Sequence, residues 1–160
     1  MFVWIASYPK SGNTLTRSLL SSYFFSHDGI FDFKLLKNIK QFPNTHLFLK
    51  DGIDVSDEKE VIKNYIKIQN SINNKNSIQF LKTHSYLFNT ENNPFTNLEN
   101  SLGAIYIVRD PRNVITSMSH HYSLSFDEAY KKLIDNKASL LEKTFNNDHS
   151  NFTFLGSWSK

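Results

Sequence analysis

The sequence predicts an α/β protein whose parallel sheet is covered by helices on both faces. Short runs of β-favouring apolar residues alternate along the chain with segments whose apolar residues have helical spacing. This alternation is typical of parallel sheets, because helices make the crossover connections between their strands. The length of 160 residues fits a single domain, and the hydrophobic fraction of 39% is sufficient for a folded core.

The first expected strand leads directly into a turn. Residues 2–5 are bulky and β-favouring, and the run stops at small polar residues. Residues 8–12 predict a tight turn, because Pro9 fixes its own φ and Gly12 can adopt backbone shapes that other residues avoid. Such a turn ahead of a helix directs several backbone N–H groups to one point, where the helix dipole and Lys10 add positive charge. This stretch therefore predicts a site for a phosphate or sulfate group.

A helix is expected from about Asn13 to about Phe25, with Gly29 as its C-terminal cap. Its apolar residues fall on one face, namely Leu15, Leu19, Leu20 and Phe24. Four phenylalanines of this region are expected in the core or in the wall of an acceptor pocket: Phe24, Phe25, Phe31 and Phe33.

The middle of the chain contains one further strand. Residues 35–39 fit a short helix, and a longer helix with a capped, acidic start is expected over about residues 56–72. Residues 77–81 form the second expected strand, which runs into the basic residues 82–84. Residues 85–100 are rich in Asn and are expected to form mainly loop.

The clearest strand covers residues 103–108, and two helices are expected after it. Pro111 suits the first turn of the next helix, which is expected to reach about Tyr122. Ser125 and Glu128 have the spacing of a capping box, which predicts the start of another helix.

Three segments with basic side chains each follow an expected strand. They are residues 8–12, 82–84 and 109–112, which together carry two Lys, two Arg and one His. In open parallel sheets, ligands bind at the carboxyl ends of the strands. We therefore expect these three segments to form one anion-binding site.

The same segments, in the same order, resemble motifs of the sulfotransferases that use 3′-phosphoadenosine 5′-phosphosulfate (PAPS). Residues 7–14 (Ser-Tyr-Pro-Lys-Ser-Gly-Asn-Thr) are similar to that family's loop for the 5′-phosphosulfate. Residues 82–84 (Lys-Thr-His) are similar to its catalytic motif. Residues 107–114, followed by Ser117 at eight positions after Arg109, are similar to its motif for the 3′-phosphate.

The resemblance implies a sulfotransferase fold of the P-loop-like type, with PAPS as co-substrate and no metal. It implies these roles: His84 as general base, Lys10 at the leaving phosphate, Lys82 at the sulfuryl group, Ser11, Gly12, Asn13 and Thr14 at the 5′-phosphate, and Arg109 and Ser117 at the 3′-phosphate. The residue types suit this chemistry, because sulfuryl transfer needs cations near the leaving phosphate and a base near the acceptor. Arginine can grip a phosphate with two hydrogen bonds.

The resemblance also implies that residues 1–160 are a single sulfotransferase domain that lacks its C-terminal portion. Family members usually continue with another strand and a late Gly-x-x-Gly-x-x-Lys segment, and residues 156–158 are similar to a family segment that precedes a helix. Leu15 stands where many members have a Trp that stacks on adenine, and Asn13 stands where Thr is frequent. The adenine contact and one phosphate contact are therefore expected to differ from those of the family.

Two other functions stay open from the sequence. One is a nucleotide-dependent phosphotransferase, although Lys10 precedes the only glycine of its turn, unlike a Walker A loop, and no Mg²⁺-binding carboxylates are evident. The other is a non-catalytic nucleotide-binding fragment. The acceptor is expected to be a small molecule or a carbohydrate, and no residue pattern selects between them or indicates an oligomeric state.

Composition and charge argue against other partners. The net charge of +3, from 18 basic and 15 acidic residues, suits an anionic ligand but is small for a nucleic-acid-binding surface. No apolar run reaches membrane-spanning length, and the absence of cysteine and the strand at residue 2 lead us to expect a cytoplasmic protein. His120 and His121 do not predict a metal site, because adjacent helix residues point in different directions.

Overall fold

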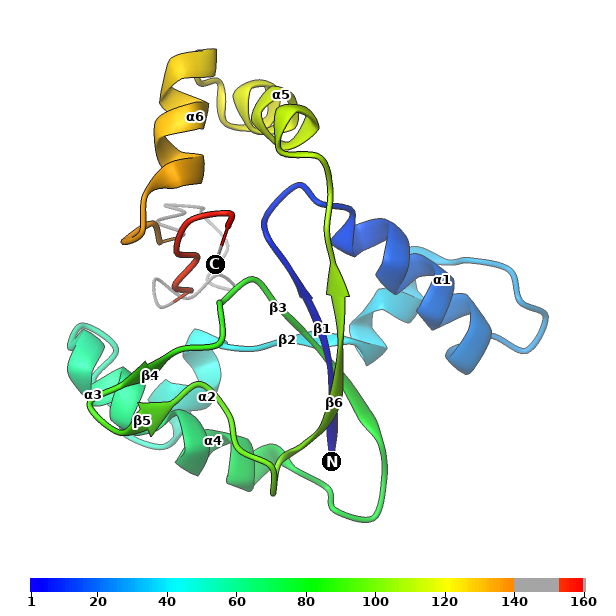
Figure 1. Ribbon diagram of the computed structural model, residues 1–160. Coiled ribbons are helices and arrows are strands. Elements are labelled where there is room, and N and C mark those ends of the chain that lie inside the picture. The colour runs from blue at the N-terminus through cyan, green and yellow to red at the C-terminus, as the bar shows by residue number, and fades with distance from the viewer. Residues whose placement is uncertain (140–152, 160) are drawn as a thin grey trace.

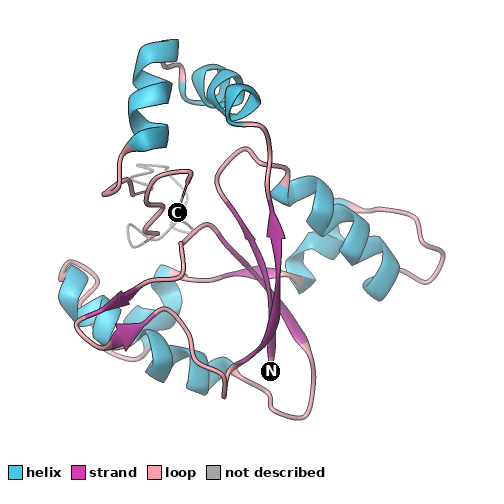
Figure 2. Cartoon of the chain, in the orientation of Figure 1, coloured by secondary structure: helices cyan, strands magenta, loops and turns pink. Residues whose placement is uncertain are grey.

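The computed structural model describes residues 1–139 and 153–159, which form a four-stranded parallel sheet flanked by helices (Figures 1 and 2). The strand order is β2-β3-β1-β6. These strands cover Lys40–Gln41 (β2), Gln79–Thr83 (β3), Phe2–Ser7 (β1) and Ser101–Ile107 (β6). The predicted fold class, a parallel sheet flanked by helices, is confirmed.

The first strand lies in the middle of the sheet and sets the position of the others. Along β1, Trp4 pairs in register with Leu81 of β3 and with Ala104 of β6. Since all these pairings are parallel, the carboxyl ends of β1, β3 and β6 lie at the same edge of the sheet. The segments that follow these strands are thus brought together, as the sequence predicted.

Three helices begin where the sequence placed them. The helix α1 spans Asn13–Phe25, α5 spans Pro111–Tyr122 and α6 spans Phe126–Ile134. Asp110 caps α5 by accepting from the N–H of Arg112 at 2.9 Å, and Ser125 and Glu128 form the expected capping box of α6. The expected cap of α1 was wrong: Ser26 ends this helix in an extended conformation, and Gly29, with φ of 76°, lies in the turn beyond it.

The middle of the chain holds more elements than were predicted. The short helix there is a 3₁₀-helix, η1, and the strand β2 and the helix α2 after it were not predicted. The helix expected over residues 56–72 is divided into two helices, since the helical conformation is interrupted at Asn64. Residues 85–100 include a small hairpin. The bounds are Phe33–Asn38 (η1), Thr45–Lys50 (α2), Glu58–Lys63 (α3), Tyr65–Ile72 (α4), Asn89–Thr90 (β4) and Asn93–Pro94 (β5).

One face of the sheet packs on an aromatic core. Trp4 lies 5.0 Å from Phe95 and 5.8 Å from Phe42, measured between ring centroids. Tyr65 begins α4 and lies 5.3 Å from both Phe42 and Phe88, and its burial raises the pKa of its phenol. A second, smaller cluster joins α5 and α6 to residues near both ends of the chain: Tyr8, Val114, Met118, Ala129, Leu133 and Leu155.

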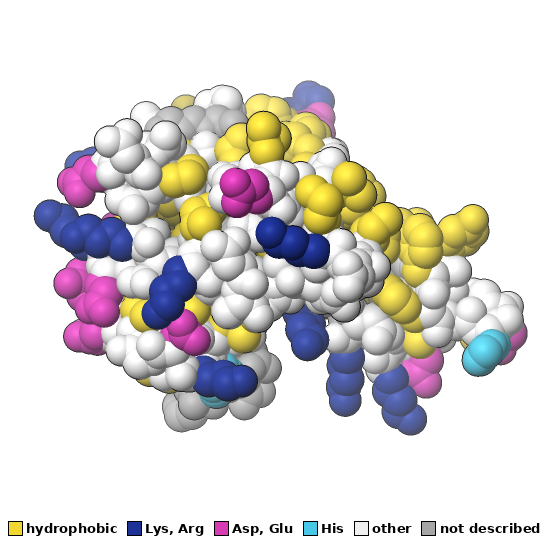
Figure 3. Space-filling model, turned by 90° about the horizontal axis from the view of Figure 1, so that it is seen from below, with side chains coloured by type: hydrophobic (Ala, Val, Ile, Leu, Met, Phe, Trp, Pro, Cys, Tyr) yellow, Lys and Arg dark blue, Asp and Glu magenta, His cyan; other side chains and the backbone are white. Residues whose placement is uncertain are grey.

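The apolar face of α1 is exposed, and not buried as its spacing suggested. Leu15 is 67% exposed and Leu19 is 65% exposed, and Figure 3 shows hydrophobic side chains on the side of the molecule where α1 lies. The inward face carries Asn13, Ser21 and Arg17, whose guanidinium donates to the carbonyl oxygens of Leu36 and Ile39. Helical spacing reveals an apolar face but does not reveal what covers it.

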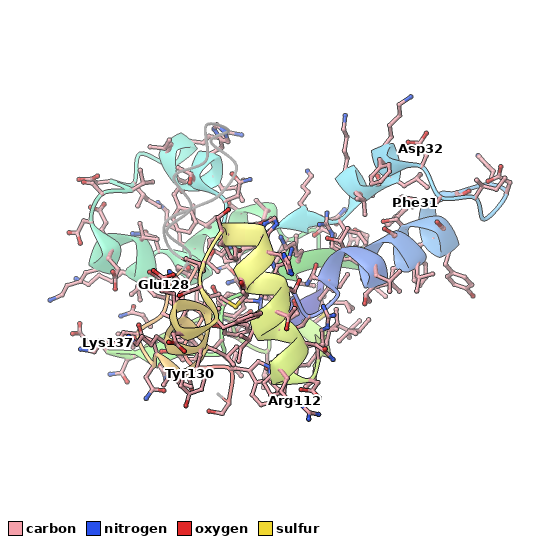
Figure 4. The ribbon with its side chains drawn as sticks, turned by 90° about the horizontal axis from the view of Figure 1, so that it is seen from above. Phe31, Asp32, Arg112, Glu128, Tyr130 and Lys137 are labelled. Carbon is pink, nitrogen blue, oxygen red and sulfur yellow. The ribbon has the colours of Figure 1, made fainter. Side chains whose placement is uncertain are left out.

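The expected core positions of Phe24, Phe25 and Phe33 were also wrong. These three side chains are exposed, Phe33 by 76%, and the ring of Phe24 lies 5.0 Å from that of Phe80. Figure 4 shows Phe31 beyond α1, far from α5 and α6. In the part of the chain that the structure describes, no helix is long and apolar enough to cross a membrane.

Candidate active site

The carboxyl ends of β1, β3 and β6 open onto one hollow of about 400 Å³, which we call the charged hollow. All of the site residues predicted from the sequence, except Ser11, line it: Lys10, Gly12, Asn13, Thr14, Lys82, His84, Arg109 and Ser117. Pro9, His121 and Tyr122 also lie in its wall. The sheet thus brings together residues that are more than 100 positions apart in the sequence.

The turn after β1 has the backbone shape of an anion-binding loop. Lys10 and Gly12 have φ of 66° and 109°, and the N–H of Ser11 donates to the carbonyl oxygen of Tyr8 at 3.3 Å. Gly12 precedes α1 directly, so the first N–H groups of this helix, which have no acceptor within it, point toward the hollow with a partial positive charge. Glycine suits this position because of its φ; a Cβ here would meet only Ile107 at 4.0 Å.

Arg109 ties the loop after β6 to the loop after β1. Its Nη1 donates to the carbonyl oxygen of Lys10 at 2.9 Å. The neighbouring carboxylate of Asp110 binds Arg112, with Nε of Arg112 3.0 Å from Oδ1 of Asp110. Figure 4 shows Arg112 at the amino-terminal end of α5. The hydrogen bonds from Arg112 lower the pKa of Asp110 to about 2, so this carboxylate is charged and already paired beside the hollow.

Asn13 and Ser11 both turn their side chains inward. The amide of Asn13 donates to the carbonyl oxygen of Ile5 at 3.2 Å and to Oγ of Ser7 at 3.1 Å, which fastens the start of α1 to β1. Ser11 is buried, and among the described residues its hydroxyl has no hydrogen-bond partner. The backbone N–H of Asn13 therefore remains as its contribution to the hollow, while its side chain holds the fold.

His84 is oriented by the end of β1. Its Nδ1 lies 2.8 Å from the carbonyl oxygen of Ser7 and 3.2 Å from Oγ of the same residue. A carbonyl oxygen can only accept, so Nδ1 carries the proton in the neutral ring and the lone pair is on Nε2. Since Asn13 in turn donates to Ser7, one chain of hydrogen bonds runs from α1 to His84. The result is an imidazole held in the tautomer that a general base needs.

Lys82 is held by a residue that the sequence did not reveal. Its Nζ donates to Oε1 of Gln41 at 3.1 Å, and the two residues are paired in the register of β2 and β3. The two-residue strand β2 was not predicted, so the role of Gln41 could not be predicted either. Lys82 lines the charged hollow together with His84 and Lys10.

The charged side chains that line the hollow are all basic. Three permanent cations line it, on Lys10, Lys82 and Arg109, together with two histidines. No carboxylate is among the described residues that line it. A wall of this kind attracts anions such as phosphate or sulfate groups.

The model of the family described as the sulfotransferase domain matches residues 2–160. The chain belongs to this family. No curated protein matches the chain. Membership in this family supports sulfotransferase activity in general.

Three wall residues of the sulfotransferase domain were not predicted as site residues: Pro9, His121 and Tyr122. His121 lies one helical turn after Ser117 on α5, and Tyr122 follows it, with the two rings 4.7 Å apart. The spacing of Ser117 and His121 is the sequence signal that could have found this histidine, because residues four apart share a helix face. Within the described residues, no group of three or more potential ligands could hold a metal ion.

Proposed function

We propose that this sulfotransferase domain transfers a sulfuryl group from PAPS to an acceptor hydroxyl or amine. One observation carries the proposal: the sheet gathers a helix N-terminus with Lys10, a histidine held as a base, and Arg109 with Ser117 around a single hollow. A phosphosulfate donor presents anionic groups at two ends, and the hollow offers cations at two sides. The acceptor must lose a proton, and His84 is the group placed to take it.

The residues of the hollow fit the two anionic ends of such a donor. The turn of residues 10–14 and the first N–H groups of α1 suit the 5′-phosphosulfate. Arg109 and Ser117 suit the 3′-phosphate, and a guanidinium has five N–H donors, so its bond to the carbonyl of Lys10 leaves capacity for a phosphate. The buried hydroxyl of Ser11, without a partner among the described residues, is a further polar group of this turn.

The proposed roles of the side chains rest on the resemblance to the family motifs and agree with their positions around the hollow. The donor supplies the sulfuryl group: a bond from the acceptor oxygen to sulfur forms as the bond from sulfur to the bridging phosphate oxygen breaks. His84 accepts the acceptor's proton at Nε2, and its Nδ1–H stays on the Ser7 carbonyl. Lys10 stabilises the negative charge that develops on the leaving phosphate oxygen, and Lys82 stabilises the oxygens in transfer.

Calorimetric titration with 3′-phosphoadenosine 5′-phosphate, the desulfated product, tests the donor site. We expect binding without metal, tighter than that of ADP with or without Mg²⁺. Arg109→Ala should weaken it by about 10- to 100-fold, because a hydrogen bond to a charged group contributes about 1.5–3 kcal/mol. The matched control is Arg112→Ala, since Arg112 pairs with Asp110 and does not line the hollow.

Two outcomes would overturn the proposal. A preference for ADP with Mg²⁺ would indicate a phosphotransferase. Binding of neither nucleotide by a folded protein would show that these residues do not form a competent donor site.

A further inference from the structure

The two edges of the parallel sheet differ in their protection against pairing with another chain. The edge strand β2 has only two residues, its Lys40 is exposed, and Pro43 follows it closely. Short length, an exposed lysine and a proline are features by which natural proteins keep edge strands from pairing. The other edge strand, β6, has seven residues, none of them charged and none a proline. Among the described residues no strand pairs with its free edge, so β6 is open to a further strand.

The open edge of β6 is bordered by apolar side chains. Those that are exposed on β6, beside it and on α1 are Leu98, Leu102, Ile105, Tyr106, Val108, Leu15 and Leu19. The ring of Phe24, on α1, lies 5.0 Å from that of Phe80, which the register of the strands places in line with Gly103. Because side chains alternate along a strand, Ile105 lies on the same face as Gly103. The helix α1 therefore covers the face of the sheet to which Ile105 belongs.

This apolar surface has the size of one side of a protein–protein interface. Each of the seven side chains exposes on the order of 100 Å², so the set approaches the area of about 800 Å² that each partner contributes to a standard interface. Figure 3 shows hydrophobic side chains gathered on the side of the molecule where α1 lies. An apolar patch larger than a few hundred Å² marks a contact surface.

We propose that this protein is a homodimer in which the β6 strands of two copies pair antiparallel and join the two sheets into one. Two identical edges paired in this way are related by a two-fold axis, so the contact closes at two copies. Each strand would supply hydrogen-bond partners for the N–H and C=O groups on the open edge of the other. Pairing of β6 with β2 of a second copy would instead repeat from copy to copy, and the protected edge of β2 opposes it.

The charges that flank β6 favour the antiparallel arrangement. Glu99 lies two residues before β6 and Arg109 lies two residues after it, and both are exposed. When two antiparallel strands overlap fully, Glu99 of each copy lies beside Arg109 of the other copy. A parallel arrangement would place like charges side by side, which is unfavourable.

Analytical ultracentrifugation tests the proposed dimer. We expect a species of twice the chain mass of 18.6 kDa. Gly103→Lys should raise the dissociation constant of the dimer by about tenfold or more, because it places a charge where the two strands meet. The position accepts a side chain, since a Cβ on Gly103 would meet no atom within 4 Å. Gly103→Ala, which adds no charge at the same position, is the matched control and should leave the dimer intact.

Cysteine cross-linking tests the register of the two strands. The chain has no cysteine, so a disulfide formed by a variant with one cysteine can only join two copies. In a full antiparallel overlap Ala104, the middle residue of β6, lies opposite itself at a Cα separation of about 4.5–5.5 Å, which a disulfide can span. Ala104→Cys should therefore give a covalent dimer on mild oxidation. Thr90→Cys, on the exposed hairpin of β4 and β5, is the control and should not.

Three results of sedimentation would overturn the inference. They are a monomer at about 100 μM, a dimer that Gly103→Lys does not weaken, and an assembly that keeps growing with concentration. Growth of this kind would indicate open pairing of edges and not a two-fold contact. If Gly103→Lys fails to fold, cross-linking decides in its place, and equal cross-linking of Ala104→Cys and Thr90→Cys would contradict the pairing of β6. None of these results depends on nucleotide binding, so the proposed function is tested separately.

Discussion

The charged hollow and a second cavity of about 310 Å³, the apolar cavity, share His84 but take their walls from different parts of the fold. The charged hollow is built from the ends of strands and the turns after them, from the start of α1 and from one face of α5. The apolar cavity takes its wall from strand residues such as Trp4, which also belongs to the aromatic core, and from loop residues such as Tyr86 and Leu155. Charge can be placed on turns without disturbing the core, whereas the shape of the apolar cavity is inseparable from core packing.

Substitution of His84, which lines both cavities, should have the largest effect on the rate of sulfuryl transfer. His84→Ala should lower the rate of sulfuryl transfer by about 10²- to 10⁴-fold, because a positioned base contributes this much. Nucleotide affinity and unfolding temperature should change little, since His84 is only partly buried. Single-turnover measurements with an acceptor alcohol would show the effect, with His120→Ala, an exposed residue of α5, as the control. Full turnover by His84→Ala would contradict the assignment.

The walls of the apolar cavity and of the charged hollow should contribute differently to the free energy of unfolding. Trp4 is 4% exposed and packs on Phe2, Phe42 and Phe95, so Trp4→Ala should lower the free energy of unfolding by about 3–5 kcal/mol. Lys10→Ala should change it by less than about 0.5 kcal/mol, because this side chain lies on a turn. Urea unfolding followed by circular dichroism would measure both. Equal losses would mean that the charged hollow is also part of the core.

The same contrast explains which features could be predicted from the sequence. The turn of residues 8–12, the start of α5 at Pro111 and the capping box at Ser125 are local signals, and the structure confirms each of these elements. The charged hollow could be assembled from them, because parallel strands end at a common edge. Residues 82–84 and 109–112 were placed correctly by that rule alone.

The apolar cavity and the middle of the chain could not be predicted in this way. The strand β2 is two residues long and is defined by its pairing with β3, so no local sequence pattern predicts it. The break at Asn64 interrupts an otherwise continuous helical spacing. The wall that joins Trp4 to Tyr86 and Leu155 depends on contacts between residues far apart in sequence, which residue spacing does not encode.

Asn13 tests the link between the fold and the charged hollow. Asn13→Ala removes two buried hydrogen bonds to β1 and should lower the free energy of unfolding by about 1–3 kcal/mol. His84 should also lose part of its positioning through Ser7, so the pH profile of turnover should shift in addition to the loss of stability. Thr14→Ala, at an exposed neighbour, is the control for stability. An unchanged pH profile would show that the amide only stabilises the fold.

Substitution of Asp110 should have the smallest effect. It tests whether the acid sensitivity of stability belongs to the region of the charged hollow. The hydrogen bonds from Arg112 lower the pKa of Asp110 to about 2 in the folded protein, below the ordinary value of about 3.9. A lowered pKa contributes stability above the ordinary value and loses it as the pH falls toward 2. Asp110→Asn should therefore lower the unfolding temperature slightly at pH 6, and the difference from the parent should shrink between about pH 4 and pH 2.

Thermal unfolding over this pH range in the Arg112→Gln background provides the control, because the Asp110 effect should largely disappear without its partner. Ala104→Phe, in the apolar cavity, should show a difference from the parent that does not depend on pH, since no carboxylate is among the described residues that line that cavity. If both variants followed the same pH curve, the acid sensitivity would belong to the whole fold. A pH-dependent difference confined to Asp110→Asn would place it at the start of α5, beside Arg109 and the charged hollow.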